Sequence, residues 1–209
     1  YTGFEGDTLA SALLAGGVRL FGRSFKYHRP RGVVTAGSEE PSALVTAGQG
    51  ARQVPNVRAT VQESFPGLEA KSPTRWPSLP VDVMEVNDLM APFFGAGFYY
   101  KTFMWPRSFW EKLYEPAIRR AAGLGALSGK HNDEHYEKAW AFCDLLVIGS
   151  GAAGLMAALA AGRAGAEVIL ADEDQLMGGR LNAECEEVGG KPGHLWVREV
   201  LAELTALPN

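Results

Sequence analysis

A glycine-rich turn in the last third of the sequence constrains the fold of this chain more than any other feature. The hexapeptide Gly149 to Gly154 reads G-S-G-A-A-G and follows a short apolar run, Leu145 to Ile148. An alanine-rich segment from Ala152 to Ala164 comes next, and a second apolar run, Val168 to Ala171, follows it. Short apolar runs of this kind are typical of buried parallel strands. The order strand, glycine turn, helix, strand predicts one βαβ unit.

The glycine turn has the spacing that binds the pyrophosphate of a dinucleotide. Gly149 permits a tight turn, Gly151 lets the backbone approach the phosphates, and Gly154 lets the helix pack closely. The helix N-terminus adds free N–H groups and a partial positive charge. Asp172 ends the second run, 23 positions after Gly149, where a carboxylate can accept both ribose hydroxyls. A glycine turn that merely packs is the alternative, and the combination of strand, helix and acid disfavours it.

A second pair of glycines, Gly178 and Gly179, precedes Arg180 shortly after that acid. In flavoprotein folds with two dinucleotides such a pair lies over the dinucleotide, although Gly-Gly is also a common turn signal. FAD and NAD share a pyrophosphate and an adenosine ribose, so the glycine turn cannot separate them. Asp172 and its neighbour Glu173 would repel a 2′-phosphate, which makes NADP the least favoured ligand.

Composition limits the remaining classes of function. The chain is 46% hydrophobic, which suffices for a core, and its net charge of −4 does not favour nucleic acid. Two cysteines are too few for a disulfide framework and indicate a reducing compartment. No apolar run reaches the roughly 18 residues of a membrane-spanning helix. We therefore expect a soluble, cytoplasmic protein with no nucleic-acid or membrane partner. Because the chain starts at Tyr1 and stops early in the dinucleotide-binding unit, we also expect it to be a fragment.

Three regions differ in texture. Residues 1–69 read as a small α+β module, with a helix over Thr8 to Ala15 capped by Asp7 and strands near 18–21, 43–46 and 57–61. Residues 70–143 are rich in proline and aromatic residues and predict an irregular arm, with helices near 107–113 and 116–122. Residues 144–209 would begin an α/β Rossmann-type domain that is truncated here.

A basic cluster with interleaved aromatic residues lies in the first region. Its members are Arg23, Lys26, His28, Arg29 and Arg31, with Phe25 and Tyr27 between them. An anion or RNA patch is one interpretation, but the acidic total argues against it. A solvated or partner-facing loop is favoured.

The segments Gly6 to Ala10 and Gly22 to Gly32 resemble the ferredoxin-like (β-grasp) N-terminal module of amine-oxidising flavoenzyme complexes. In the iron–sulfur members of that group, cysteines at plant-type spacing follow the R-P-R-G sequence that here ends at Gly32. Residues 33–44 contain no cysteine. Because a cluster needs four thiolates, or two plus histidines, we expect that this module holds none.

The missing cysteines and three segments together are similar to the α subunit of heterotetrameric sarcosine oxidase. The segments are E-E-P-S-A-L at 39–44, G-F-Y-Y-K-T-F at 97–103 and C-D-L-L-V-I-G at 143–149. The resemblance implies an α subunit that binds NAD. It further implies a β subunit that carries FAD and shares a covalently attached FMN, a small zinc-binding subunit, and a folate-binding C-terminal domain outside this chain. The implied reaction is oxidative demethylation of sarcosine to glycine, with hydrogen peroxide formed and a one-carbon unit passed to tetrahydrofolate.

The family motif carries the NAD contacts onto eight positions of this sequence: Gly149, Gly151, Ala153, Gly154, Asp172, Glu173, Gly179 and Arg180. The chain offers no nucleophile–base pair, no carboxylate dyad and no full set of metal ligands, so we expect neither a catalytic residue nor a metal site in it. One alternative is the α subunit of an amino-acid dehydrogenase or hydrogen cyanide synthase complex, although those relatives usually keep the cluster cysteines. Another is a non-catalytic scaffold that holds subunits together.

Overall fold

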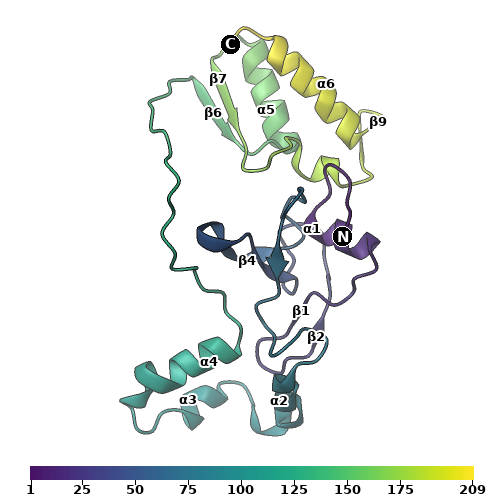
Figure 1. Cartoon of the computed structure of the whole chain (residues 1–209). Helices are drawn as coiled ribbons and strands as arrows, with labels where there is room; N and C mark the ends of the chain where they lie inside the picture. The colour runs from purple at the N-terminus through teal and green to yellow at the C-terminus, as the bar shows by residue number, and fades with distance from the viewer.

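A computed structural model describes all residues, 1–209 (Figure 1). An α+β part at the N-terminus leads into an arm of short helices, and an extended segment then connects the arm to an α/β part at the C-terminus (Figure 1). The extended segment, residues 124–143, contains no helix or strand. No helix combines the length and the apolar character that crossing a membrane requires.

The N-terminal part contains one helix and two small antiparallel sheets. Strands β1 (Gly22–Arg23) and β2 (Pro30–Arg31) form a hairpin. Strand β3 (Leu44–Ala47) lies between β4 (Val54–Arg58) and β5 (Ala70–Lys71), and a short 3-10 helix, Gly50–Arg52, connects β3 to β4. Helix α1 (Leu9–Ala15) packs on this sheet. The shared core consists of Leu9, Ala10, Phe21, Ala43, Val45 and Ala59.

Helix α1 begins at a capping box. The Thr8 hydroxyl accepts from the Ser11 amide at 3.1 Å, and the Ser11 hydroxyl accepts from the Thr8 amide at 2.9 Å. Thr8 is therefore the N-cap, and the prediction that Asp7 caps the helix is wrong. Asp7 instead accepts from the Ser11 hydroxyl at 2.9 Å and from the Phe4 amide at 2.7 Å, so it supports the turn before the helix.

The strands of this part depart from the sequence prediction in position. Residues 18–21 are not a strand, because sheet pairing begins only at Gly22. The apolar side chain of Phe21 is instead buried in the core. Strand β3 lies one residue later than expected. Strand β4 covers 54–58 in place of 57–61, because the chain turns after Arg58, where the Val61 amide donates to the Arg58 carbonyl.

The arm contains only short elements. In chain order they are η2 (Val83–Glu85), α2 (Val86–Leu89), η3 (Ala91–Phe93), α3 (Phe98–Thr102), the π-helical turn η4 (Trp110–Tyr114) and α4 (Glu115–Ala121). The helix expected at 107–113 is therefore shorter and starts later, whereas the helix expected at 116–122 agrees with α4 to within one residue.

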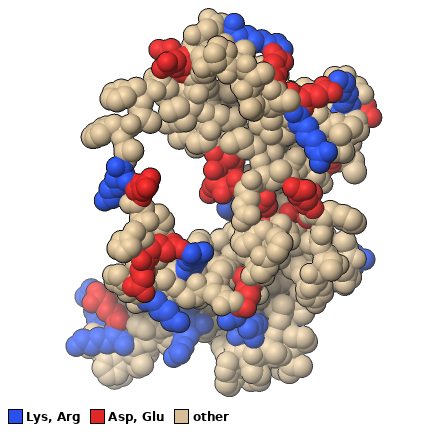
Figure 2. All heavy atoms as spheres, turned by 45° about the horizontal axis from the view of Figure 1, so that its top comes forward, with Lys and Arg blue, Asp and Glu red and all other residues tan.

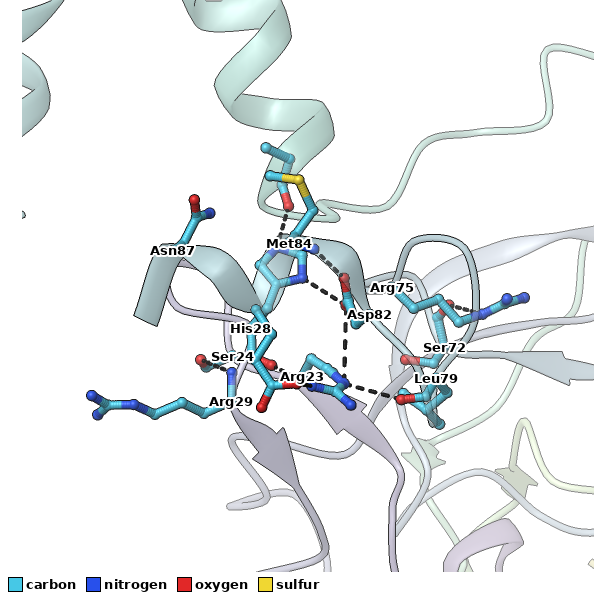
Figure 3. A network of polar contacts seen from close by, with 12 residues as sticks. Arg23, Ser24, His28, Arg29, Ser72, Arg75, Leu79, Asp82, Met84 and Asn87 are labelled. Carbon is cyan, nitrogen blue, oxygen red and sulfur yellow. Dashed lines mark hydrogen bonds and ion pairs between the residues drawn. The ribbon is translucent and has the colours of Figure 1, made fainter. Parts of the chain in front are cut away.

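A polar network fastens the arm to the hairpin β1–β2 (Figure 3). Arg23 donates to the Glu85 carboxylate at 2.8 Å and to the Leu79 carbonyl at 3.0 Å. His28 places Nδ1 2.8 Å from the Asp82 carboxylate and Nε2 2.8 Å from the carbonyl of Ala121 in α4.

The network corrects the prediction made for the basic cluster. Arg23 is only 5% exposed and His28 only 2%, so neither belongs to a solvated or partner-facing loop. Acidic side chains of the arm surround them in the fold, which the sequence pattern of the cluster alone does not show. Arg29 and Arg31 do remain exposed at the surface.

The C-terminal part has the predicted order of elements. Strands β6 (Leu145–Ile148) and β7 (Val168–Ala171) pair in parallel, and α5 (Ala152–Arg163) connects them. A 3-10 helix, η5 (Gly179–Asn182), and the hairpin β8 (Glu187–Val188) and β9 (Lys191–Pro192) follow. Helix α6 (Gly193–Ala206) packs on α5 around the apolar side chains of Leu155, Leu159, Leu181, Val197 and Val200.

Candidate functional site

The glycine turn lies between the end of β6 and the start of α5. Gly149 has φ +100°, a conformation that favours glycine, and its amide donates to the Ala171 carbonyl at 2.8 Å. A Cβ atom on Gly154 would lie 1.9 Å from the Gly149 carbonyl oxygen, so no other residue fits there without displacing the turn. A Cβ atom on Gly151 would meet no atom within 4 Å, which leaves open space on that side of the turn.

The N-terminus of α5 provides the electrostatics of the turn. The first N–H groups of a helix have no partner within the helix, and the helix dipole gives this end a partial positive charge. Ala153 lies in this first turn and is exposed, and the turn carries no acidic side chain. The open side of the glycine turn is therefore suited to an anionic group.

Asp172 follows β7 and faces this turn. One of its carboxylate oxygens accepts a hydrogen bond from the Ser150 amide, and the other accepts from the Asp174 amide at 2.9 Å. Burial raises the pKa of Asp172, but hydrogen bonds from Ser150, Asp174 and Glu173 outweigh it and hold the pKa below its usual range. An ionised carboxylate has about four acceptor positions, so Asp172 can accept further hydrogen bonds from hydroxyl groups.

Ser150 connects three segments of the site and is absent from the sequence prediction. Its amide donates to Asp172, and its fully buried hydroxyl accepts from the Gly178 amide at 2.9 Å. The neighbouring Gly179 then lies against the first turn, since a Cβ on it would be 3.3 Å from the Gly151 Cα. The structure thus brings the two glycine turns and Asp172 together. The position of Ser150 inside the glycine motif was the available signal, but its burial depends on the distant second turn.

Glu173 and Arg180 lie at the edge of this arrangement. Both are exposed. Arg180 donates to the Glu184 carboxylate at 2.6 Å. Its guanidinium also lies against Gly37 of the N-terminal part, since a Cβ atom on Gly37 would be 3.1 Å from it. Arg180 therefore makes no ion pair with Asp172 or Glu173.

The N-terminal part also contributes to this region through Glu63. The Glu63 carboxylate accepts from the amides of Gln175 at 2.6 Å and Leu176 at 3.0 Å, in the loop after β7. A cavity of about 150 Å³ lies at this junction, with Thr60 and Glu63 on one side and Asp174 on the other. A larger cavity, of about 1040 Å³, lies at the N-terminus of the chain and away from the glycine turn.

The junction is acidic. Figure 2 shows acidic side chains gathered where the upper and lower parts of the molecule meet. Burial, followed by repulsion from Asp172, Glu63 and Glu173, raises the pKa of Asp174 to about 6. Sequence reasoning missed Glu63, because its partners are backbone amides more than a hundred residues away.

Two family models match separate parts of the chain. Residues 1–75 match a family model described as a 2Fe-2S iron-sulfur cluster binding domain, which supports the ferredoxin-like N-terminal module. Residues 144–201 match a family model described as an FAD dependent oxidoreductase.

Individual relatives match along nearly the entire chain. Identity is 61% over 207 residues with the sarcosine oxidase subunit alpha of Rhizobium meliloti (strain 1021), covering 99% of this chain and 21% of that protein. It is 34% and 32%, each over 204 residues, with the subunits of the same name from Corynebacterium sp. strains U-96 and P-1, covering 97% of this chain and 16% of each. The chain thus spans about a fifth or less of the length of these relatives. Over nearly all of its residues the chain is homologous to a segment of sarcosine oxidase alpha subunits, which confirms the resemblance recognised in the sequence.

Proposed function

We propose that this chain binds NAD as part of the alpha subunit of a sarcosine oxidase. The observation that carries the proposal is the convergence of Asp172 and both glycine turns at the N-terminus of α5, joined by Ser150. A dinucleotide needs an anion site for its pyrophosphate and an acceptor for its ribose hydroxyls, and the arrangement offers both within one βαβ unit.

The proposed contacts follow the chemistry of each position. Gly149, Gly151, Ala153 and Gly154 would surround the pyrophosphate, because they form the turn and the first turn of α5. Asp172 would accept the ribose hydroxyls. Three further proposed contacts are Glu173, Gly179 and Arg180. The negative charge of Asp172 and Glu173 disfavours the 2′-phosphate of NADP.

The choice of NAD over FAD rests on the family resemblance. The family model that matches residues 144–201 is described as an FAD dependent oxidoreductase, and the glycine turn suits either dinucleotide. Both ligands present the same groups to Asp172, so direct identification of the bound dinucleotide decides between them.

The homology also supports a proposal for the wider assembly. We propose a heterotetramer in which a β subunit carries FAD and shares a covalently attached FMN, a small subunit binds zinc, and a later folate domain of the alpha subunit receives the one-carbon unit. The proposed reaction converts sarcosine to glycine, forms hydrogen peroxide and delivers the methyl carbon to tetrahydrofolate. In this proposal residues 1–69, 70–143 and 144–209 are the ferredoxin-like module, the arm and the start of the NAD domain, and the oxidation takes place elsewhere. Exposed side chains of the arm, such as Phe93 and Trp105, support contact with partner subunits.

Replacing Asp172 by alanine in the full subunit tests the dinucleotide site. The variant is expected to retain NAD about ten- to a hundredfold less tightly, because a hydrogen bond to a charged group contributes about 1.5–3 kcal/mol. Cofactors extracted from the purified complex and separated by chromatography give the NAD and FAD content of each variant.

Asp144→Ala is the matched control. Asp144 also accepts a backbone hydrogen bond, from Glu167 at 2.9 Å, but it lies at the opposite end of the β6–β7 pair. The control is expected to keep its full NAD content. Loss of FAD with NAD retained in Asp172→Ala would show that the site holds a flavin, and retention of both cofactors would show that Asp172 binds neither.

A further inference from the structure

The ferredoxin-like module does not contain the ligands of an iron–sulfur cluster. The two cysteines of the chain, Cys143 and Cys185, lie outside residues 1–75. His28, the one histidine of the module, is buried and engaged with Asp82 and Ala121. Because a cluster needs four thiolates, or two with two histidines, the residues present do not fit it.

The loop that would surround a cluster encloses a carboxylate instead. Glu40 is only 1% exposed. One carboxylate oxygen accepts from the amides of Val34 at 2.7 Å and Thr35 at 2.8 Å. The other accepts from the amides of Ser42 at 2.7 Å and Ala43 at 3.0 Å.

No cation compensates this buried carboxylate. Glu40 forms no ion pair, and Arg58 reaches only its backbone carbonyl, at 3.2 Å. A buried charge without a partner is costly, so the four amides must provide the compensation. Burial alone would raise the pKa of Glu40, but the four hydrogen bonds hold it below its usual range. The carboxylate is therefore ionised and held by two pairs of consecutive backbone N–H groups.

The loop stands directly after the R-P-R-G sequence, where the iron–sulfur members of the group carry their cysteines. Plant-type clusters use the spacing C-x4-C-x2-C, and here Thr35, Glu40 and Ala43 stand at those intervals. Consecutive backbone N–H groups form anion-binding concavities that hold many iron–sulfur sites. We propose that the Glu40 carboxylate takes the place of the cluster in the loop from Val33 to Ala43 and supplies the negative charge around which its amides fold.

The proposal explains how the module keeps a structural role without metal. Gly37, in the same loop, lies against the guanidinium of Arg180, and its carbonyl accepts from the buried Thr60 hydroxyl at 2.6 Å. A loop without an anion at its centre would leave four N–H groups unsatisfied and would lose the contacts of Gly37 with Arg180 and Thr60. In this chain the loop therefore packs beside the second glycine turn.

Amide hydrogen exchange in the full assembled complex tests the role of Glu40. In Glu40→Gln one oxygen becomes an NH₂ group that opposes two N–H donors, so peptides covering 33–44 are expected to exchange at least about tenfold faster. Glu40→Ala is expected to have the larger effect. Glu39→Ala is the matched control, because Glu39 is the adjacent glutamate and is exposed.

Small carboxylates then separate charge from volume. Formate added to Glu40→Ala is expected to restore slow exchange in 33–44, whereas neutral formamide of similar size does not. Exchange in both Glu40 variants equal to that of Glu39→Ala would overturn the proposal, and so would equal effects of formate and formamide. These readouts do not depend on which dinucleotide the chain binds.

Discussion

Replacing Asp82 by alanine tests whether the polar network of Figure 3 holds the arm in place. The Asp82 side chain is fully buried and accepts from the Met84 amide at 2.9 Å, while His28 Nδ1 lies 2.8 Å away. Arg23 Nε lies 4.0 Å from the same carboxylate, with the Arg23 side chain only 3% exposed. The substitution leaves a buried guanidinium with Glu85 as its remaining carboxylate partner.

The expected loss follows from this geometry. The substitution deprives the Met84 amide and the His28 ring of their buried acceptor, which costs about 1–3 kcal/mol, whereas Arg23 keeps its contact with Glu85. Asp82 also orients the His28 ring, whose Nε2 lies 2.8 Å from the Ala121 carbonyl, so the substitution weakens the contact of the hairpin β1–β2 with α4 as well. Amide exchange of peptides covering 83–90 and 115–122 is therefore expected to be about ten- to a hundredfold faster in the assembled complex.

Two further variants make this result interpretable. Asp88→Ala removes an exposed ion pair with Arg29 in the same arm and is expected to change exchange little, since exposed pairs contribute little. Asp82→Asn keeps the shape and an acceptor oxygen, so an intermediate effect is expected. Exchange in Asp82→Ala that matches Asp88→Ala would refute the conclusion that this network fastens the arm.

Two more substitutions probe the C-terminal part. Gly154→Ala is expected to abolish dinucleotide retention, because its Cβ would lie 1.9 Å from the Gly149 carbonyl oxygen. Gly162→Ala in the same helix is expected to retain the ligand, because its Cβ would meet only the end of the Leu207 side chain, at 2.9 Å. Cofactor content after gel filtration compares the two variants, and equal retention would contradict the proposed packing. Asp174, with its pKa raised to about 6, destabilises the folded state most above pH 6, and this cost declines as pH falls from 6 toward its ordinary pKa. The wild type is therefore expected to gain thermal stability between pH 7 and pH 5 relative to Asp174→Asn. The pKa values of Glu40 and Asp172 are lowered, so both titrate below this window, and an unchanged pH dependence in Asp174→Asn would contradict the assignment.

The βαβ unit could be predicted because its signals are local. A continuous apolar run is typical of a parallel strand, and β6 and β7 have the bounds that these runs predict. The burial expected of such strands is not present in this chain, where Leu146 is 53% and Ile148 82% exposed. The glycine spacing fixes the turn, as the close approach of Gly154 to Gly149 shows. In the N-terminal part the same rule failed at 18–21, because an apolar run there reflects burial in a core and not pairing in a sheet.

The surroundings of the basic cluster could not be predicted from the cluster itself. Arg23 and His28 find their partners 54 to 93 positions further along the chain, in a region without periodic pattern. Only the folded arm brings Asp82 and Glu85 beside them. The charge pattern therefore identified the basic cluster, but it could not show whether water or other protein groups surround its side chains.

Glu40, Glu63 and Ser150 share a reason for having been missed. Each accepts hydrogen bonds from backbone amides, which lie in the same loop for Glu40 and in a distant segment for Glu63 and Ser150. Nearly every residue has such an amide, so no complementary residue type marks the contact in the sequence. An ion pair at least requires a residue of opposite charge, whereas an amide cradle requires only a backbone conformation. For Glu40 a signal does exist, since Thr35, Glu40 and Ala43 stand at the intervals of a C-x4-C-x2-C pattern. In the proposal made above, an acid at that position follows from electrostatics, because backbone amides that converge on one point need an anion.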